Sequence, residues 1–173
     1  MADIRAYIAL GANLGDPAAQ VERAFAELVR LPSTRLGARS RLYLSKAEGY
    51  AAQPDFVNAV AAISTLLTPR ALLEALLDIE ARHGRRRDFK NAPRTLDLDL
   101  LLYDDLVLHE PGLTLPHPRM CERAFVLQPM HEIAPEQAIP GKGSVADCLA
   151  VLLAGGLSNP AVAGQQLPAW NTA

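Results

Sequence analysis

The sequence predicts an α+β protein: a ferredoxin-like (split βαβ) antiparallel sheet with helices packed on it, plus C-terminal helical additions. Apolar residues alternate between strand-like and helix-like spacing in the order β-α-β-β-α-β, which is typical of this arrangement. The 173 residues can bury a sizeable core, and no internal repeat or linker interrupts them. We therefore expect one domain over residues 1–155 and an extension over 156–173, which is rich in Gly, Ala and Pro.

The first elements are a strand and a helix. Residues 6–10 are a short apolar run, which predicts a strand. Asp16 and Pro17 are typical of a helix start, because Asp caps the first turn and Pro has no N–H to lose there. Apolar residues at helical spacing then extend the helix to residue 31.

Two antiparallel strands are expected next, at residues 38–45 and 55–65. The polar loop between them, at 46–54, is longer than a hairpin needs and suits a cover over a substrate. In the second strand Phe56 and Asn58 share a face, and an aromatic ring beside an amide can hold a flat heterocycle. Taken alone, such a pair is more often a core Phe and a strand-end Asn.

Thr68 and Pro69 begin the next predicted helix, which carries a broad apolar stripe. Turn residues and apolar spacing then predict the remaining elements. These are helices over 69–82, 120–131 and 144–153, and strands over 97–102 and 106–108.

The strand after residue 96 carries the chemistry. Its leucines point one way while Asp97 and Asp99 point the other. Neighbouring carboxylates repel each other, and Mg²⁺ relieves that repulsion, because it binds one or two carboxylates and fills its other positions with water and substrate phosphates. The alternative is an edge strand whose aspartates face water.

A basic cluster precedes this strand and favours a phosphate substrate. It consists of Arg82, Arg85, Arg86, Arg87, Lys90 and Arg94. Guanidinium groups beside metal-binding carboxylates are what a polyphosphate needs. Farther along, His117 and Arg123 flank a predicted helix start, from which both side chains can reach a phosphate; the alternative for His117 is a surface turn.

The bulk composition excludes several classes of function. The net charge of −2 gives no global field for nucleic acid or an anionic membrane. Residues 1–5 lack a signal-peptide pattern and no apolar run is long enough to cross a bilayer, so we expect a cytoplasmic protein. Cys121 and Cys148 have no metal-site spacing, and we expect ordinary thiols in a reducing compartment.

Several motifs together resemble one family, the 6-hydroxymethyl-7,8-dihydropterin pyrophosphokinases of folate synthesis. The most specific is Pro-Arg-Thr-Leu-Asp-Leu-Asp at 93–99. The others are moderate alone and strong as a set, at residues 7–16, 53–59, 84–87, 115–118 and 123–127. The resemblance covers about residues 6–135. It implies transfer of pyrophosphate from ATP to the hydroxymethyl group of the pterin, with release of AMP.

The resemblance also implies a role for individual residues. Asp97 and Asp99 would hold two Mg²⁺ ions and, with Arg85 and Arg94, form the catalytic set. The implied ATP contacts are Glu80, Arg87, Lys90, Arg94, Thr114, His117 and Arg123. The implied pterin contacts are Ser45, Phe56, Asn58 and Phe125, with the two phenylalanines on either side of the ring. The implied partners are these small molecules, without nucleic acid or membrane, and the implied state is a monomer.

The chain departs from the family pattern in its loops. Residues 44–49 lack the usual Thr-Pro-rich run, and residues 88–92 lack a Trp and have Lys90 as the nearest cation. These changes predict an active enzyme whose loops close differently. Alternatives are a catalytically impaired paralogue or a pyrophosphokinase for a related pterin. An RNA-binding module is disfavoured, because the paired stacking aromatics it needs are missing.

Overall fold

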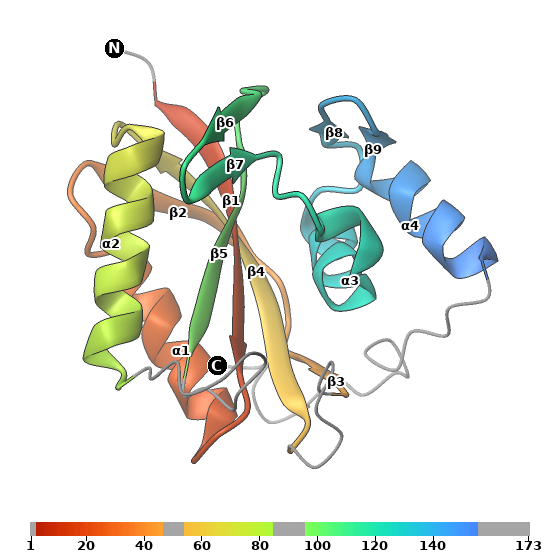
Figure 1. Cartoon of the computed structure of the whole chain (residues 1–173). Helices are drawn as coiled ribbons and strands as arrows, with labels where there is room; N and C mark the ends of the chain where they lie inside the picture. Colours follow the sequence, from red (N-terminus) through yellow and green to blue (C-terminus); the bar gives the residue numbers. More distant parts are fainter. Residues whose placement is uncertain (1–2, 47–53, 85–95, 156–173) are drawn as a thin grey trace.

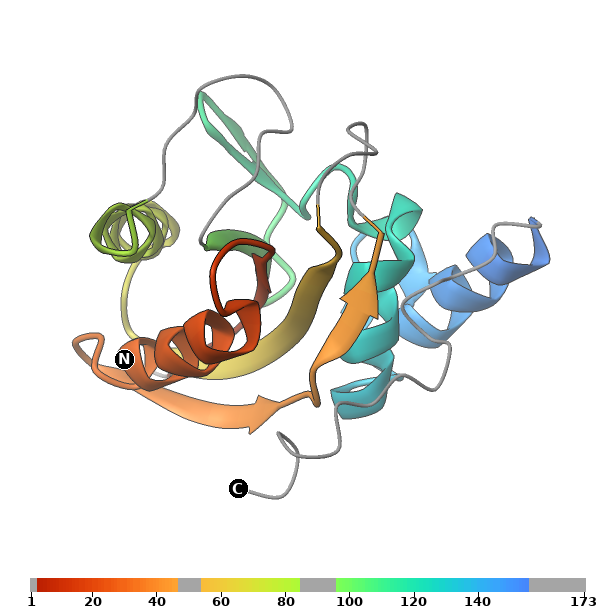
Figure 2. The ribbon, with the colours of Figure 1, turned by 90° about the horizontal axis from the view of Figure 1, so that it is seen from below.

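The computed structural model describes residues 3–46, 54–84 and 96–155. Its architecture is α+β, with three layers (Figure 1). Helices α1 (Pro17–Leu28) and α2 (Pro69–Arg82) cover one face of the sheet, whereas α3 (Ala124–Ile133) and α4 (Val145–Ala154) lie on the other side. The view from below shows the same division of the helices (Figure 2).

The main sheet is antiparallel at every pairing and has the strand order β2-β4-β1-β5. Its strands are β1 (Ile4–Ala12), β2 (Thr34–Arg39), β4 (Phe56–Thr65) and β5 (Asp97–Tyr103). A further short strand, β3 (Tyr43–Ser45), pairs with the first part of β4. The long strands β1 and β4 are therefore at the centre of the sheet, between the two helical layers.

The predicted helix starts are confirmed. Asp16 accepts a hydrogen bond from the Ala19 amide at 3.2 Å, and Thr68 accepts one from the Ala71 amide at 3.1 Å. Each cap satisfies an N–H group that has no partner within its own helix. The second helix has the bounds that the sequence predicts, and the first ends three residues early, at Leu28.

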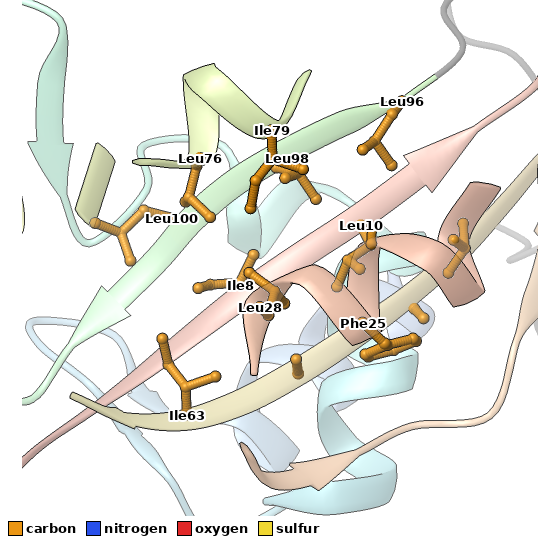
Figure 3. Packing of buried hydrophobic residues seen from close by; sticks show 14 of the residues in the cluster. Ile8, Leu10, Phe25, Leu28, Ile63, Leu76, Ile79, Leu96, Leu98 and Leu100 are labelled. Atoms are coloured by element: carbon orange, nitrogen blue, oxygen red, sulfur yellow. The ribbon is translucent and has the colours of Figure 1, made fainter. Parts of the chain in front are cut away.

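The period-two pattern of β5 divides its side chains between the two faces of the sheet. Leu96, which precedes the strand, and Leu98 and Leu100 within it pack among α1, α2 and the apolar side chains of β1 (Figure 3). A second core lies on the opposite face, between Tyr7 and Val60 of the sheet and the inner side of α3. Asp97 and Asp99 alternate with the leucines and therefore face the side of α3.

The expected strand over 38–45 is wrong, because it is two strands that flank an irregular segment. The edge strand begins at Thr34 and ends at Arg39, and its register shifts between Leu36 and Ala38. At Ser40 the backbone amide donates to the Val60 carbonyl, but the Ser40 hydroxyl accepts from the Val60 amide. A side chain thus replaces the backbone carbonyl, which interrupts the ladder.

The second half contains further differences from the prediction. The helix expected from residue 120 is a short 3-10 turn, η1 (Met120–Glu122), followed by α3. The strand expected at 106–108 is a hairpin of β6 (Leu108–Glu110) and β7 (Leu113–Leu115), in which Gly112 adopts a φ of +74°. The strand pair β8 (Ala138–Ile139) and β9 (Gly143–Ser144) was not predicted. Among the described residues, no helix is long and apolar enough to cross a membrane.

Candidate active site

The two carboxylates of β5 lie opposite small residues of β1. Asp97 pairs with Gly11 and Asp99 pairs with Ala9 across the antiparallel ladder. Cross-strand partners share a face of the sheet, so a bulky residue at either position of β1 would fill the space beside the acids. The small residues leave this end of the sheet open.

A cavity lies over this open end of the sheet and encloses about 660 Å³ of empty space, including its mouth. The strands β1, β3, β4 and β5 and the first turn of α3 all contribute to its wall. The lining residues are Ala9, Leu10, Gly11, Ser45, Lys46, Phe56, Asn58, Asp97, Asp99, Arg123, Phe125 and Val126.

All four predicted pterin contacts line this cavity. Asn58 is 5% exposed, and its amide nitrogen donates to the Ser45 hydroxyl at 2.6 Å. On its other side, a Cβ atom added at Gly11 would lie 3.2 Å from the Asn58 side-chain oxygen. The amide is therefore fixed by one hydrogen bond and one close backbone approach. A planar ring that needs both a donor and an acceptor fits such a fixed amide.

Arg123 lies between the acidic and aromatic parts of the cavity. Its Nη1 is 3.9 Å from Oδ2 of Asp99, and its guanidinium carbon is 5.6 Å from the centroid of the Phe125 ring. The side chain is 18% exposed, so its charge is only partly screened by water. One cation thus links a carboxylate of β5 to the aromatic ring at the start of α3.

His117 lies close to the charges of this site but is held as a neutral imidazole. Its Nδ1 accepts a hydrogen bond from the Arg119 amide at 3.1 Å, so the ring proton is on Nε2. Burial, together with the positive charges of Arg123 and Arg119, lowers the pKa of His117 to about 4, and the negative charge of Asp97 opposes this. At neutral pH His117 offers a ligand a hydrogen-bond donor rather than a positive charge.

The structure places three of the predicted nucleotide contacts outside the cavity wall: His117, Glu80 and Thr114. Glu80 is 3% exposed, and its Oε2 accepts a hydrogen bond from the Leu98 amide at 2.6 Å. It therefore fixes the backbone between the two aspartates from the α2 side of the sheet. Thr114 is half-buried in β7, where it pairs with His109 of β6. Four predicted cations, Arg85, Arg87, Lys90 and Arg94, lie outside the described residues, as does most of the loop expected over 46–54.

The donor set of the cavity fits Mg²⁺. Within residues 3–46, 54–84 and 96–155, no cluster of three or more His, Cys, Asp or Glu side chains is arranged to hold a metal. Two carboxylates alone suit an ion that keeps several waters and takes its remaining oxygens from substrate phosphates. They do not suit a structural metal, which needs a complete set of protein ligands.

Known proteins match most of this chain. The model of the 7,8-dihydro-6-hydroxymethylpterin-pyrophosphokinase (HPPK) family matches residues 7–135. This chain belongs to that family. The match includes both aspartates and every other described residue that lines the cavity.

Relatives of this HPPK family member support the assignment over nearly their whole length. The 2-amino-4-hydroxy-6-hydroxymethyldihydropteridine pyrophosphokinase of Pseudomonas aeruginosa is 48% identical over 146 residues, which cover 84% of this chain and 90% of that protein. The protein of the same name from Methylorubrum extorquens is 45% identical over 148 residues, with 86% and 93% covered. The similarity therefore extends well beyond the short motifs.

Solved structures show the same fold at low identity. The crystal structure of wild-type Plasmodium falciparum HPPK-DHPS has a TM-score of 0.69 and 12% identity; the match covers 88% of this chain. The chain spans only 45% of that Plasmodium chain. At this low identity the likeness concerns the fold alone.

Sequence reasoning did not name five residues that line this HPPK cavity: Ala9, Leu10, Gly11, Lys46 and Val126. Ala9 and Gly11 were interpreted only as strand and turn residues, although the strand register places them opposite the aspartates. Lys46 lines the cavity and lies 4.0 Å from a carboxylate oxygen of Asp55. For the two small residues, a strand pairing deduced from sequence is the signal that finds them.

Proposed function

We propose that this chain transfers pyrophosphate from ATP to the hydroxymethyl group of 6-hydroxymethyl-7,8-dihydropterin and produces the pterin diphosphate and AMP in folate biosynthesis. The observation that carries the proposal is one cavity in which Asp97 and Asp99 face the same space as Phe56, Asn58 and Phe125. An acidic pair for metal-bound phosphate and a ring-binding wall are the two halves that this reaction needs. The relatives from Pseudomonas aeruginosa and Methylorubrum extorquens are named for this activity, and the match covers 90% and 93% of their length.

The metal part of the proposal rests on the two carboxylates of β5, whose oxygen atoms fit Mg²⁺. Asp97 and Asp99 would hold two Mg²⁺ ions, which would supply charge neutralisation on the ATP phosphates. Because both aspartates serve the metal, neither is available as a free base. Their rigid spacing on β5, fixed in part by Glu80, orients the phosphates for in-line attack.

The pterin proposal uses the fixed amide and the aromatic rings. Phe56 and Phe125 bind the faces of the ring, and Asn58 hydrogen-bonds its polar edge with Ser45 behind it. The hydroxymethyl oxygen then forms a bond to the β-phosphorus of ATP, and the bond from that phosphorus to the α-phosphate oxygen breaks. The hydroxymethyl proton leaves to solvent, and AMP departs with the bridging oxygen.

Cations provide the remaining charge neutralisation. Arg123 is next to Asp99, so it contacts the phosphates at the point where metal and pterin sites meet. His117 adds an Nε2–H donor. From the family resemblance, we assign Arg85, Arg87, Lys90 and Arg94 to the phosphates as well, and Glu80 and Thr114 to the nucleotide side.

The proposal also covers the domain, the oligomeric state, the location and the partners of the enzyme. A ferredoxin-like, split βαβ domain over residues 1–155 contains the whole activity, and 156–173 is an extension. We assign the enzyme as a monomer in the cytoplasm, as the sequence analysis implies. It binds neither nucleic acid nor membrane.

The test is release of AMP from ATP by the purified chain with Mg²⁺ and the reduced pterin. We expect turnover by the wild type and a loss of about 100-fold or more in Asp97→Ala, because the metal loses half of its protein ligands. Asp105→Ala, at an exposed position after β5, is the matched control and should keep full activity.

Isothermal titration with a non-hydrolysable ATP analogue separates the alternatives. Mg²⁺-dependent binding without AMP release would indicate a catalytically impaired paralogue. Faster turnover of another reduced pterin alcohol would indicate a related substrate. No Mg²⁺-dependent binding, or full activity of Asp97→Ala, would contradict the proposal.

A further inference from the structure

The two cysteines of this chain, 27 positions apart in the sequence, meet on the surface of the second core. Cys121 belongs to η1 and Cys148 to α4, and their sulfur atoms are 3.6 Å apart. The Cys148 thiol also lies 3.4 Å from the Lys142 carbonyl oxygen. The sequence contains no other cysteine. The fold therefore brings the two thiols together, although their spacing in the sequence does not predict this contact.

The distance is short enough for a covalent bond to form after a small movement. An S–S bond is about 2 Å long, so the sulfurs need to approach by about 1.5 Å in total. Both residues lie in short or terminal elements, η1 and α4, rather than in the central sheet. Cys121 is half-buried and can meet a small solute, whereas Cys148 is buried, with 8% of its surface exposed.

We propose that Cys121 and Cys148 form a modification site, which a peroxide oxidises to an intrachain disulfide. The Cys121 sulfur attacks one peroxide oxygen, the O–O bond breaks, and the products are Cys121 sulfenic acid and water or the corresponding alcohol. The Cys148 sulfur then attacks the sulfenic sulfur and displaces its oxygen as a second water. Two thiols are oxidised by two electrons, and one peroxide is reduced.

The groups around the Cys121 thiol determine how fast it is oxidised. Burial, together with the neighbouring Cys148 thiol, raises the pKa of Cys121 to about 12; the positive charge of Lys142 opposes this and the negative charge of Glu122 adds to it. The thiol is therefore protonated at neutral pH, and only its thiolate attacks peroxide. The site responds slowly at neutral pH and faster as the pH rises.

The disulfide connects the start of the α3 wall to α4. η1 leads directly to Arg123 and Phe125, which line the cavity, while α4 is the last helix that the structure describes. The closed loop contains α3, β8 and β9, so the bond restricts opening of this whole layer. We expect slower amide exchange across 121–148 and a melting temperature several degrees higher than in the reduced protein.

The experiment treats the full-length folded protein with hydrogen peroxide and then removes the peroxide before denaturation. The expected result is loss of both titratable thiols, a monomer about 2 Da lighter, and a peptide pair joining Cys121 to Cys148. Formation should be about 100-fold faster at pH 9 than at pH 7, because the thiolate fraction rises tenfold per pH unit. Reduction should restore both thiols and the lower melting temperature.

Two serine variants define the order of the steps. Cys148→Ser should accumulate a sulfenic acid at Cys121 that a dimedone probe traps, whereas Cys121→Ser should react with the probe far less. Two thiols that survive peroxide in the folded wild type would overturn the proposal, and so would a disulfide found only between two chains. The readouts are mass and thiol count, so they do not depend on the proposed pyrophosphokinase activity.

Discussion

His117 is a neutral side chain in a charged setting, and this has a consequence for stability. Burial and two nearby arginines lower its pKa to about 4, whereas an exposed histidine has a pKa of 6.5. The unfolded chain therefore takes up a proton at this position at a higher pH than the folded chain does. Above pH 6.5 the titration of His117 does not change the free energy of unfolding. As the pH falls from 6.5 toward 4, it lowers that free energy.

We expect the free energy of unfolding to fall by about 2 to 3 kcal/mol from this histidine alone between pH 7 and pH 4. His117→Gln removes the titration and should flatten that part of the curve. The measurement is urea unfolding at a series of pH values, with His109→Gln, at an exposed position, as the matched control. Parallel curves for wild type and His117→Gln would contradict the prediction.

Ser45 controls the orientation of Asn58. Replacing it with Ala removes the oxygen that accepts from the buried Asn58 amide nitrogen at 2.6 Å, and leaves that N–H group without its acceptor. Such a loss costs about 1 to 3 kcal/mol in stability. Because the amide is then free to rotate, we also expect the KM for the pterin to rise severalfold with the KM for ATP unchanged.

Steady-state kinetics with each substrate varied in turn check the Ser45→Ala prediction. Ser45→Thr keeps the hydroxyl and is the matched control, which should retain the wild-type KM values. An equal rise in both KM values would mean that the whole cavity, rather than the amide alone, depends on Ser45.

At the scale of elements, Glu80 joins α2 to β5. Its carboxylate accepts from the Leu98 amide, which lies between Asp97 and Asp99 in the strand. An edge strand has backbone groups that a neighbouring strand does not satisfy, and here a buried side chain from a helix satisfies one of them. A contact made from the α2 side of the sheet thus holds the backbone between the two carboxylates that we propose bind metal.

Glu80→Ala should lower the free energy of unfolding by about 3 kcal/mol, because it leaves a buried N–H group and a cavity. Glu80→Gln keeps an acceptor of the same length and should lower it much less. Denaturant unfolding gives the free energies, and amide exchange at Leu98 reports the hydrogen bond directly. Equal destabilisation by Gln and Ala would show that charge, not the acceptor, is what the site needs.

At the scale of the whole molecule, periodic patterns predicted most of the framework. The alternation of leucine and aspartate in 96–100 gave the strand, its faces and the two acids of the cavity. Asp16 and Thr68 marked two helix starts that the structure confirms. These features are local, so the sequence alone determines them.

Contacts between distant residues were not predictable in this way. The Ser40 hydroxyl replaces a backbone carbonyl of the edge strand, which no periodicity reveals. Tyr43 donates to Glu132 at 2.6 Å across 89 positions, and the two cysteines meet across 27. The family resemblance implied a place for Glu80 along the nucleotide site, but it did not reveal that the Glu80 carboxylate accepts from the Leu98 amide. Each of these depends on how the layers are stacked.

The alternation from Asp97 to Leu100, in the first part of β5, has one more consequence. Inserting a single residue at its beginning would turn both acids into the leucine layer and turn leucines toward the substrate, so folding and chemistry would fail together. Inserting two would restore the original orientation of every side chain beyond the insertion. Natural variation in the length of β5 before its register shift, which follows Leu100, should therefore come only in even steps.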